Sequence, residues 1–191
     1  MTKRILLAGV LGGLTIFLWS SLSHMVLMLG GTGIKSMPHE DVVLSVIHEN
    51  VREPGFYFFP GMDESKKMSA EEQKQWEDKY RKGPAGIMIL QPPGADPMMV
   101  RQLLTELASN IVCLLIAAFL LSQTLSGGST FAGRLLFVAL MGLFASTAID
   151  VSYWNWYRFP DSYTLAAMTD AVVGHGLAGI VLAAIIKPRP A

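Results

Sequence analysis

The chain has 191 residues, of which 51% are hydrophobic and only 16% are charged. Its 15 basic and 15 acidic residues cancel, which argues against a nucleic-acid-binding protein that relies on a positively charged surface. The single cysteine, Cys113, excludes an intramolecular disulfide and every cysteine-based metal motif. A composition this apolar and this poor in charge is typical of a chain that lies in a membrane.

Four apolar stretches are long enough to cross a bilayer. The first covers residues 1–29, and because no Ala-x-Ala-like cleavage site follows Leu29 we expect a retained helix and not a signal peptide. The other three cover residues 99–125, 131–154 and 163–187. Each approaches the roughly 20 apolar residues that span a hydrocarbon core of about 30 Å. The sequence therefore predicts an all-α membrane protein built as a four-transmembrane-helix bundle.

Basic residues in the short flanks predict the orientation of these helices. Lys3 and Arg4 precede the first helix, and Arg134 lies in the connection between the second and third. Lys187 and Arg189 follow the fourth helix. Because short cytoplasmic loops carry the excess of Lys and Arg, we expect both termini in the cytoplasm and the long first loop in the periplasm.

The loop of residues 30–98 is predicted to fold as a small α+β extracytoplasmic domain. Residues 38–51 have apolar side chains at helical spacing, and residues 69–81 open with a Ser-Ala-Glu-Glu capping box. Two strand candidates, residues 55–60 and 86–90, are followed by proline and glycine turn signals. We expect these two strands to pair with each other.

An aromatic cluster follows the third apolar stretch. Asp150 closes that stretch, and four aromatic residues come soon after it: Tyr153, Trp154, Trp156 and Tyr157. Trp and Tyr favour the headgroup zone of a bilayer. We therefore predict that these four residues form an interfacial aromatic collar in an outward-facing turn.

Small residues recur at a spacing of four within the predicted membrane helices. Gly9 and Gly13 form a Gly-x-x-x-Gly in the first helix, and Gly142 and Gly174 each begin a similar spacing in the third and fourth. Such rows let helix backbones approach closely in lipid. Packing of the four helices with one another is the favoured interpretation, and a face for a dimer or a partner is the alternative.

Polar and ionisable side chains gather in the outer half of the predicted bundle. They come from all four helices: His24, Glu106, Asn110, Asp150, Asp170 and His175. Because an ionisable group is costly in lipid, we expect these residues to face the bundle interior and to pair.

Three interpretations of this polar cluster are open. The favoured one is structural, with carboxylates hydrogen-bonded to histidines, Asn110 or arginines so that they lock the bundle. In the second, His24 and His175 bind haem or another tetrapyrrole, or the same imidazoles and the carboxylates bind a divalent metal. The third is a proton or ion path, against which the almost purely apolar inner half argues.

Three stretches of sequence resemble a group of proteins whose function is uncharacterised. They are residues 55–62, 102–106 and 150–157. Together they resemble a group of small four-helix bacterial inner-membrane proteins, and the resemblance covers most of the chain. It implies a location in the bacterial inner membrane and carries no activity.

No sequence motif indicates catalysis, since Ser-His-Asp spacing, a P-loop and a Rossmann glycine pattern are all missing from the sequence. We therefore expect a non-catalytic accessory or assembly subunit that docks to a larger membrane protein complex, with lipid and other membrane subunits as partners. One alternative is a membrane redox protein that binds haem, another tetrapyrrole or a metal through His24 and His175. Another is a small transporter or sensor with a periplasmic ligand domain.

Overall fold

The computed structural model describes residues 1–62, 65–91, 93–94, 97, 100–125 and 129–188. The chain divides into two compact units, one of Met1–Ile34 with Met98–Ala191 and one of Lys35–Pro97. Arg189 and residue 99, where the second membrane helix was predicted to begin, lie outside the described residues.

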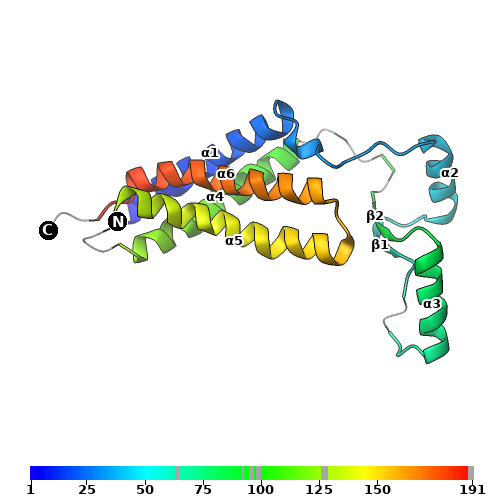
Figure 1. Cartoon of the computed structure of the whole chain (residues 1–191). Helices are drawn as coiled ribbons and strands as arrows, with labels where there is room; N and C mark the ends of the chain where they lie inside the picture. Colours follow the sequence, from blue (N-terminus) through cyan, green and yellow to red (C-terminus); the bar gives the residue numbers. More distant parts are fainter. Residues whose placement is uncertain (63–64, 92, 95–96, 98–99, 126–128, 189–191) are drawn as a thin grey trace. The chain divides into compact units, whose positions relative to one another are not determined.

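The first unit is built from four long helices. These are α1 (Thr2–Met25), α4 (Val100–Gln123), α5 (Phe131–Tyr157) and α6 (Asp161–Ile185) (Figure 1). Each is long and apolar enough to cross a membrane, which confirms that four stretches have the length and composition of membrane spans. A short 3-10 helix, η1 (Leu29–Gly31), follows α1.

The predicted outward-facing turn is shorter than expected. Because α5 continues to Tyr157, the four residues of the aromatic collar lie in its last two turns and not in a loop. Arg158 then takes a left-handed backbone conformation with φ of 60°, which ends the helix before α6 begins at Asp161. Trp154 holds the two helix ends together, since its Nε1 donates a hydrogen bond of 2.6 Å to Asp161 Oδ1.

The four long helices pack as antiparallel neighbours in the order α4–α1–α6–α5, and α4 makes little contact with α5. Glycines allow the close approaches. A Cβ on Gly13 would lie 2.5 Å from the Cα atom of Ile111 in α4, and a Cβ on Gly142 would lie 2.6 Å from the Cβ of His175 in α6. The small-residue rows of α1 and α5 therefore face other helices of this chain.

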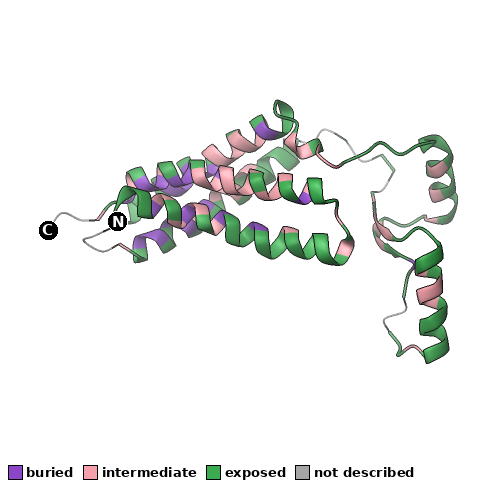
Figure 2. Ribbon diagram, in the orientation of Figure 1, coloured by how far each residue is buried: buried purple, intermediate pink, exposed green. Residues whose placement is uncertain are grey.

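The largest buried cluster lies at the end of the bundle where α1 begins and α6 ends (Figure 2). All four helices contribute to it: Ala8, Leu114, Ala117, Ala118, Leu121, Val138, Ala178, Leu182 and Ile186. The tight part of the bundle is thus the end that holds the N-terminus, and the opposite end is more open.

The second unit combines α2 (Glu40–Asn50), β1 (Gly55–Phe59), α3 (Ala70–Lys82) and β2 (Gly86–Leu90). The strands pair antiparallel, as predicted, with Gly55 opposite Leu90 and Phe59 opposite Gly86. Trp76 holds α3 to the end of β1, because its Nε1 donates a 3.0 Å hydrogen bond to the carbonyl oxygen of Pro60.

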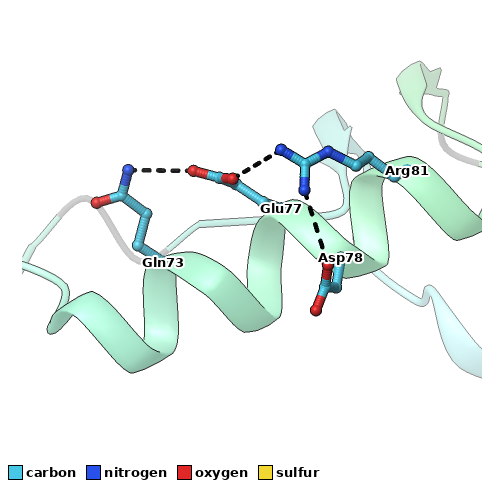
Figure 3. Close-up of polar contacts among 4 residues, drawn as sticks. All are labelled: Gln73, Glu77, Asp78 and Arg81. Atoms are coloured by element: carbon cyan, nitrogen blue, oxygen red, sulfur yellow. Dashed lines mark hydrogen bonds and ion pairs between the residues drawn. The ribbon is translucent and has the colours of Figure 1, made fainter.

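Ion pairs and hydrogen bonds run along the exposed surface of α3 (Figure 3). Arg81 Nη2 lies 2.9 Å from Glu77 Oε2, and Arg81 Nη1 lies 3.8 Å from Asp78 Oδ1. Gln73 Nε2 donates a 3.3 Å hydrogen bond to Glu77 Oε1. The Arg81 side chain is 69% exposed, so water and salt screen these pairs. Each pair stabilises the helix by about 0.3 kcal/mol.

A capping box begins α3. The backbone N–H and the hydroxyl of Ser69 both donate to the carboxylate of Glu72, at 2.8 and 2.9 Å, and these bonds lower the pKa of Glu72 below its ordinary value of about 4.5. A lowered pKa means that the carboxylate supports the folded helix end above pH 4.5 and loses this effect as the pH falls through the lowered value.

We therefore expect the first turn of α3 to open more often in acid than at pH 7. Hydrogen exchange of the Glu72 backbone N–H, corrected for its intrinsic pH dependence, measures this opening. Glu72→Gln should remove the pH dependence because the amide does not titrate. Equal protection at pH 3 and pH 7 in the unaltered chain would contradict this role of the carboxylate.

Candidate functional site

A cavity of about 280 Å³ lies between α1, η1, α5 and α6, at the end of the bundle opposite the buried cluster. Three of the predicted polar residues line it: His24 from α1, Asp150 from α5 and Asp170 from α6. The rest of the wall is Leu29, Gly30, Tyr163, Ala166, Ala167 and Ala171. The three alanines of α6 leave this space open, because larger side chains at these positions would fill it.

Asp150 is held by its own helix. The hydroxyl of Ser146, one turn earlier in α5, donates a 2.5 Å hydrogen bond to Asp150 Oδ2. The sequence predicted histidine, asparagine or arginine partners, and within the described residues Asp150 is bonded instead to this serine. Asp150 therefore has a hydrogen bond but forms no ion pair within the described part of the chain.

Asp170 is the least satisfied group of the cavity. Its Oδ1 is buried and has no hydrogen-bond partner among the described residues. The backbone carbonyl oxygen of Asp170 accepts a 3.2 Å hydrogen bond from Trp19 Nε1, which links α1 to α6. A buried carboxylate oxygen without a partner is costly, so a donor that reached it would be stabilised.

His24 is oriented from its own helix and from η1. Its Nδ1 lies 3.0 Å from the carbonyl oxygen of Ser20 and 3.0 Å from the hydroxyl of Ser23. Gly30 lies against the ring, and a Cβ there would lie 2.0 Å from His24 Cδ2, so a larger residue would displace the imidazole. The imidazole thus lies beside η1 with its Nδ1 engaged by the serines.

The other predicted polar residues lie elsewhere. His175 packs against Gly142, and its Nδ1 lies 2.9 Å from the carbonyl oxygen of Ala171. On α4, the amide of Asn110 donates a 3.1 Å hydrogen bond to Glu106. None of these polar side chains lines the cavity. The predicted cluster therefore divides into three separate sites and is not one network.

The two predicted cofactor ligands do not share this cavity, since its lining includes His24 and not His175. Across the described ranges, no group of three or more His, Cys, Asp or Glu side chains is placed to hold a metal ion. The haem and metal hypotheses stay predictions. The cavity itself is lined by two carboxylates and one imidazole.

One residue with a defined role was missed by sequence reasoning. Arg134 was counted only as a flanking charge, although it falls within the predicted helix of residues 131–154; it lies inside the first turns of α5, only 6% exposed. Its Nε and Nη2 donate to the carbonyl oxygen of Ala183 at 3.2 and 3.1 Å, and its Nη1 donates to Ser129 at 2.6 Å. The last carbonyls of a helix lack partners in the helix itself, so Arg134 completes the end of α6.

The second unit holds a larger cavity of about 560 Å³ between the end of α2 and the end of β2. Apolar side chains such as Leu44 and Ile47 line it beside the charged residues Glu49 and Arg52. The two charges have opposite signs, so the lining favours neither cations nor anions.

Comparison with protein-family models, curated proteins and solved structures finds no match to this chain. The resemblance drawn from residues 55–62, 102–106 and 150–157 therefore remains an expectation.

Proposed function

We propose that this chain is a non-catalytic accessory subunit that docks to a larger protein complex in the bacterial inner membrane. Four membrane helices hold it there, with both termini in the cytoplasm and the second unit in the periplasm. The observation that carries the proposal is the exposed Glu106, bonded to Asn110 in the outer half of α4.

The depth of Glu106 makes its exposure significant. Leu121 is buried near the inner end of α4, and about 20 residues fill a hydrocarbon core of about 30 Å. Counted back from Leu121 at about 1.5 Å per residue, Glu106 lies about 6 Å inside the outer edge of the core and Asn110 about 12 Å inside it. A carboxylate at that depth normally faces protein, so another protein is expected to cover this flank.

The neighbours of Glu106 are consistent with an uncovered interface. Because α4 packs mainly along α1 and makes little contact with α5, much of its surface has no helix of this chain along it. Leu103 and Leu104 on the same outer half are 58% and 60% exposed. In a symmetric dimer through this patch, Glu106 would approach its own copy and the like charges would repel. The expected occupant is therefore a different membrane protein whose helix presents a hydrogen-bond donor or a cation.

The second unit supports the same role. Pro60 is its one buried residue within the described ranges, while Val42, Phe56 and Ile89 are 64%, 57% and 65% exposed. A small water-soluble domain with so little buried apolar surface has little hydrophobic stabilisation of its own. Contact with a partner subunit would bury these side chains.

The docking role is tested by the substitution Glu106→Leu. We expect the unaltered chain to migrate on a native gel of gently solubilised membranes as part of a complex that contains a different membrane protein. Glu106→Leu should weaken that association by about 2 kcal/mol or more, roughly thirtyfold. The isolated chain should keep its melting temperature, because leucine suits lipid better than a carboxylate.

The matched control is Phe144→Leu, a change on α5 at a side chain that is 76% exposed. It should leave the complex intact. A chain that migrates alone, or only with copies of itself, would refute the accessory role.

The proposed orientation is tested by chemical labelling. Cys113 is the single cysteine, so Cys113→Ser gives a background without thiols. In that background we expect Lys74→Cys, on α3, to react with a membrane-impermeant maleimide in cells whose outer membrane has been made permeable. Labelling only after the inner membrane is disrupted would reverse the orientation.

A further inference from the structure

We propose that the cavity lined by Asp150, Asp170 and His24 binds a protonated primary amine, either free or as the headgroup of an aminophospholipid. This binding site is separate from the docking flank on α4, because Glu106 and Asn110 do not line the cavity. The proposal rests on the charge of the cavity, its one unsatisfied buried atom, its size and its walls.

The charge favours a cation. Two carboxylates line the cavity, and no lysine or arginine is among the lining residues. Within the described part of the chain neither Asp150 nor Asp170 forms an ion pair. Carboxylates in a partly enclosed site are stabilised by a positive charge beside them. An anion would bring a negative group for which these walls offer no lysine or arginine, so the phosphate of an aminophospholipid would stay outside the cavity.

The hydrogen-bonding requirement narrows the kind of cation. Asp170 Oδ1 is buried and lacks a donor among the described residues. A primary ammonium has three N–H donors, which can serve both carboxylates at once. A quaternary ammonium has no N–H and would leave Asp170 Oδ1 unsatisfied. A metal ion is disfavoured, because the two carboxylates and the imidazole are not placed to hold one together, and no other such group occurs among the described residues.

The size and the apolar walls fit a small organic amine. A volume of about 280 Å³ equals that of about nine water molecules at about 30 Å³ each. Tyr163 supplies an aromatic wall, which attracts cations, and the alanines of α6 can contact a short carbon chain. The cavity therefore has more than enough room for ethanolamine, which has four non-hydrogen atoms.

Ethanolamine, choline and ethylene glycol are the probes for the free amine. All three have a two-carbon chain with a hydroxyl at one end. At the other end ethanolamine has a primary ammonium, choline a quaternary ammonium and ethylene glycol a second hydroxyl. The full chain is placed in nanodiscs of phosphatidylcholine, whose headgroup is quaternary, and its melting temperature is followed at pH 7. At this pH an aliphatic amine is protonated. We expect ethanolamine to stabilise the protein in a saturable manner, and choline and ethylene glycol to have no comparable effect.

A second set of nanodiscs contains phosphatidylethanolamine and no free amine. Stabilisation by this lipid without an effect of free ethanolamine would assign the headgroup as the ligand. The reverse result would assign a soluble amine. If neither source stabilises the protein, or if choline acts as well as ethanolamine, the proposal is overturned.

Two variants tie the effect to the cavity. Asp170→Asn keeps the size of the side chain and removes its charge, so it should weaken amine binding at least tenfold. Ala167→Leu should fill the cavity and have the same consequence, which decides the matter if Asp170→Asn does not fold. The matched control Asp41→Asn, an exposed carboxylate on α2, should bind like the unaltered chain. Equal amine binding by Ala167→Leu and the unaltered chain would overturn the proposal.

Discussion

Replacing Gly13 with alanine is expected to destabilise the four-helix unit by about 1–3 kcal/mol, the usual cost of overpacking. The added Cβ would lie 2.5 Å from the Cα and 2.7 Å from the backbone nitrogen of Ile111, so α1 and α4 must move apart. Alanine is intrinsically the better helix former by about 1 kcal/mol, so a measured loss would show that the close contact outweighs this gain. The melting temperature of the purified chain reports the change.

Gly176→Ala is the matched control for that measurement. It makes the same substitution in another long helix, α6, but a Cβ at Gly176 would meet nothing within 4 Å. We expect it to leave the melting temperature unchanged or to raise it. Equal effects of the two substitutions would contradict the close packing of α1 against α4.

Replacing Arg134 with methionine should destabilise the same unit by about 2–4 kcal/mol. Methionine keeps much of the volume but removes the donors that satisfy the carbonyl oxygens of Ala183 and Ser129. Arg134→Lys should recover only part of the lost stability. Its ammonium can still donate a hydrogen bond, but it cannot reproduce the two parallel bonds to the Ala183 carbonyl oxygen. Thermal unfolding in detergent compares the three proteins.

Arg4→Met is the control for Arg134→Met, because Arg4 lies near the same end of the bundle but is exposed. It should change the stability little. If both methionine variants behave alike, the buried hydrogen bonds of Arg134 do not stabilise the fold and its charge acts only on orientation.

The long helices could be predicted from the sequence, since length and apolar composition alone distinguish a possible membrane span. The pair of strands was also predictable, because proline and glycine bound both predicted strands, residues 55–60 and 86–90. The end of α5 was not. Aromatic residues suit both a helix and an interfacial loop, and the left-handed conformation of Arg158 that ends α5 carries no signal in the sequence.

The polar residues show where sequence reasoning reaches its limit. Depth along each helix placed Asp150, Asp170 and His24 near one end of the bundle, and they do line one cavity. Depth does not give the rotation of a helix about its axis, and rotation is what directs Glu106 away from that cavity. Arg134 was missed for a related reason, because its partner is a backbone carbonyl of α6 that no side-chain pattern reveals.

Docking through α4 is tested most directly by photo-crosslinking in native membranes. A photoreactive amino acid is placed at Leu103, which is exposed one helical turn from Glu106, and in a second protein at Phe144 on α5. We expect the probe at Leu103 to capture one particular multi-span membrane protein, to lose that adduct when Glu106→Leu is added, and to yield none from Phe144. Adducts to lipid or to a second copy of the chain alone, or an adduct indifferent to Glu106→Leu, would contradict the accessory-subunit role.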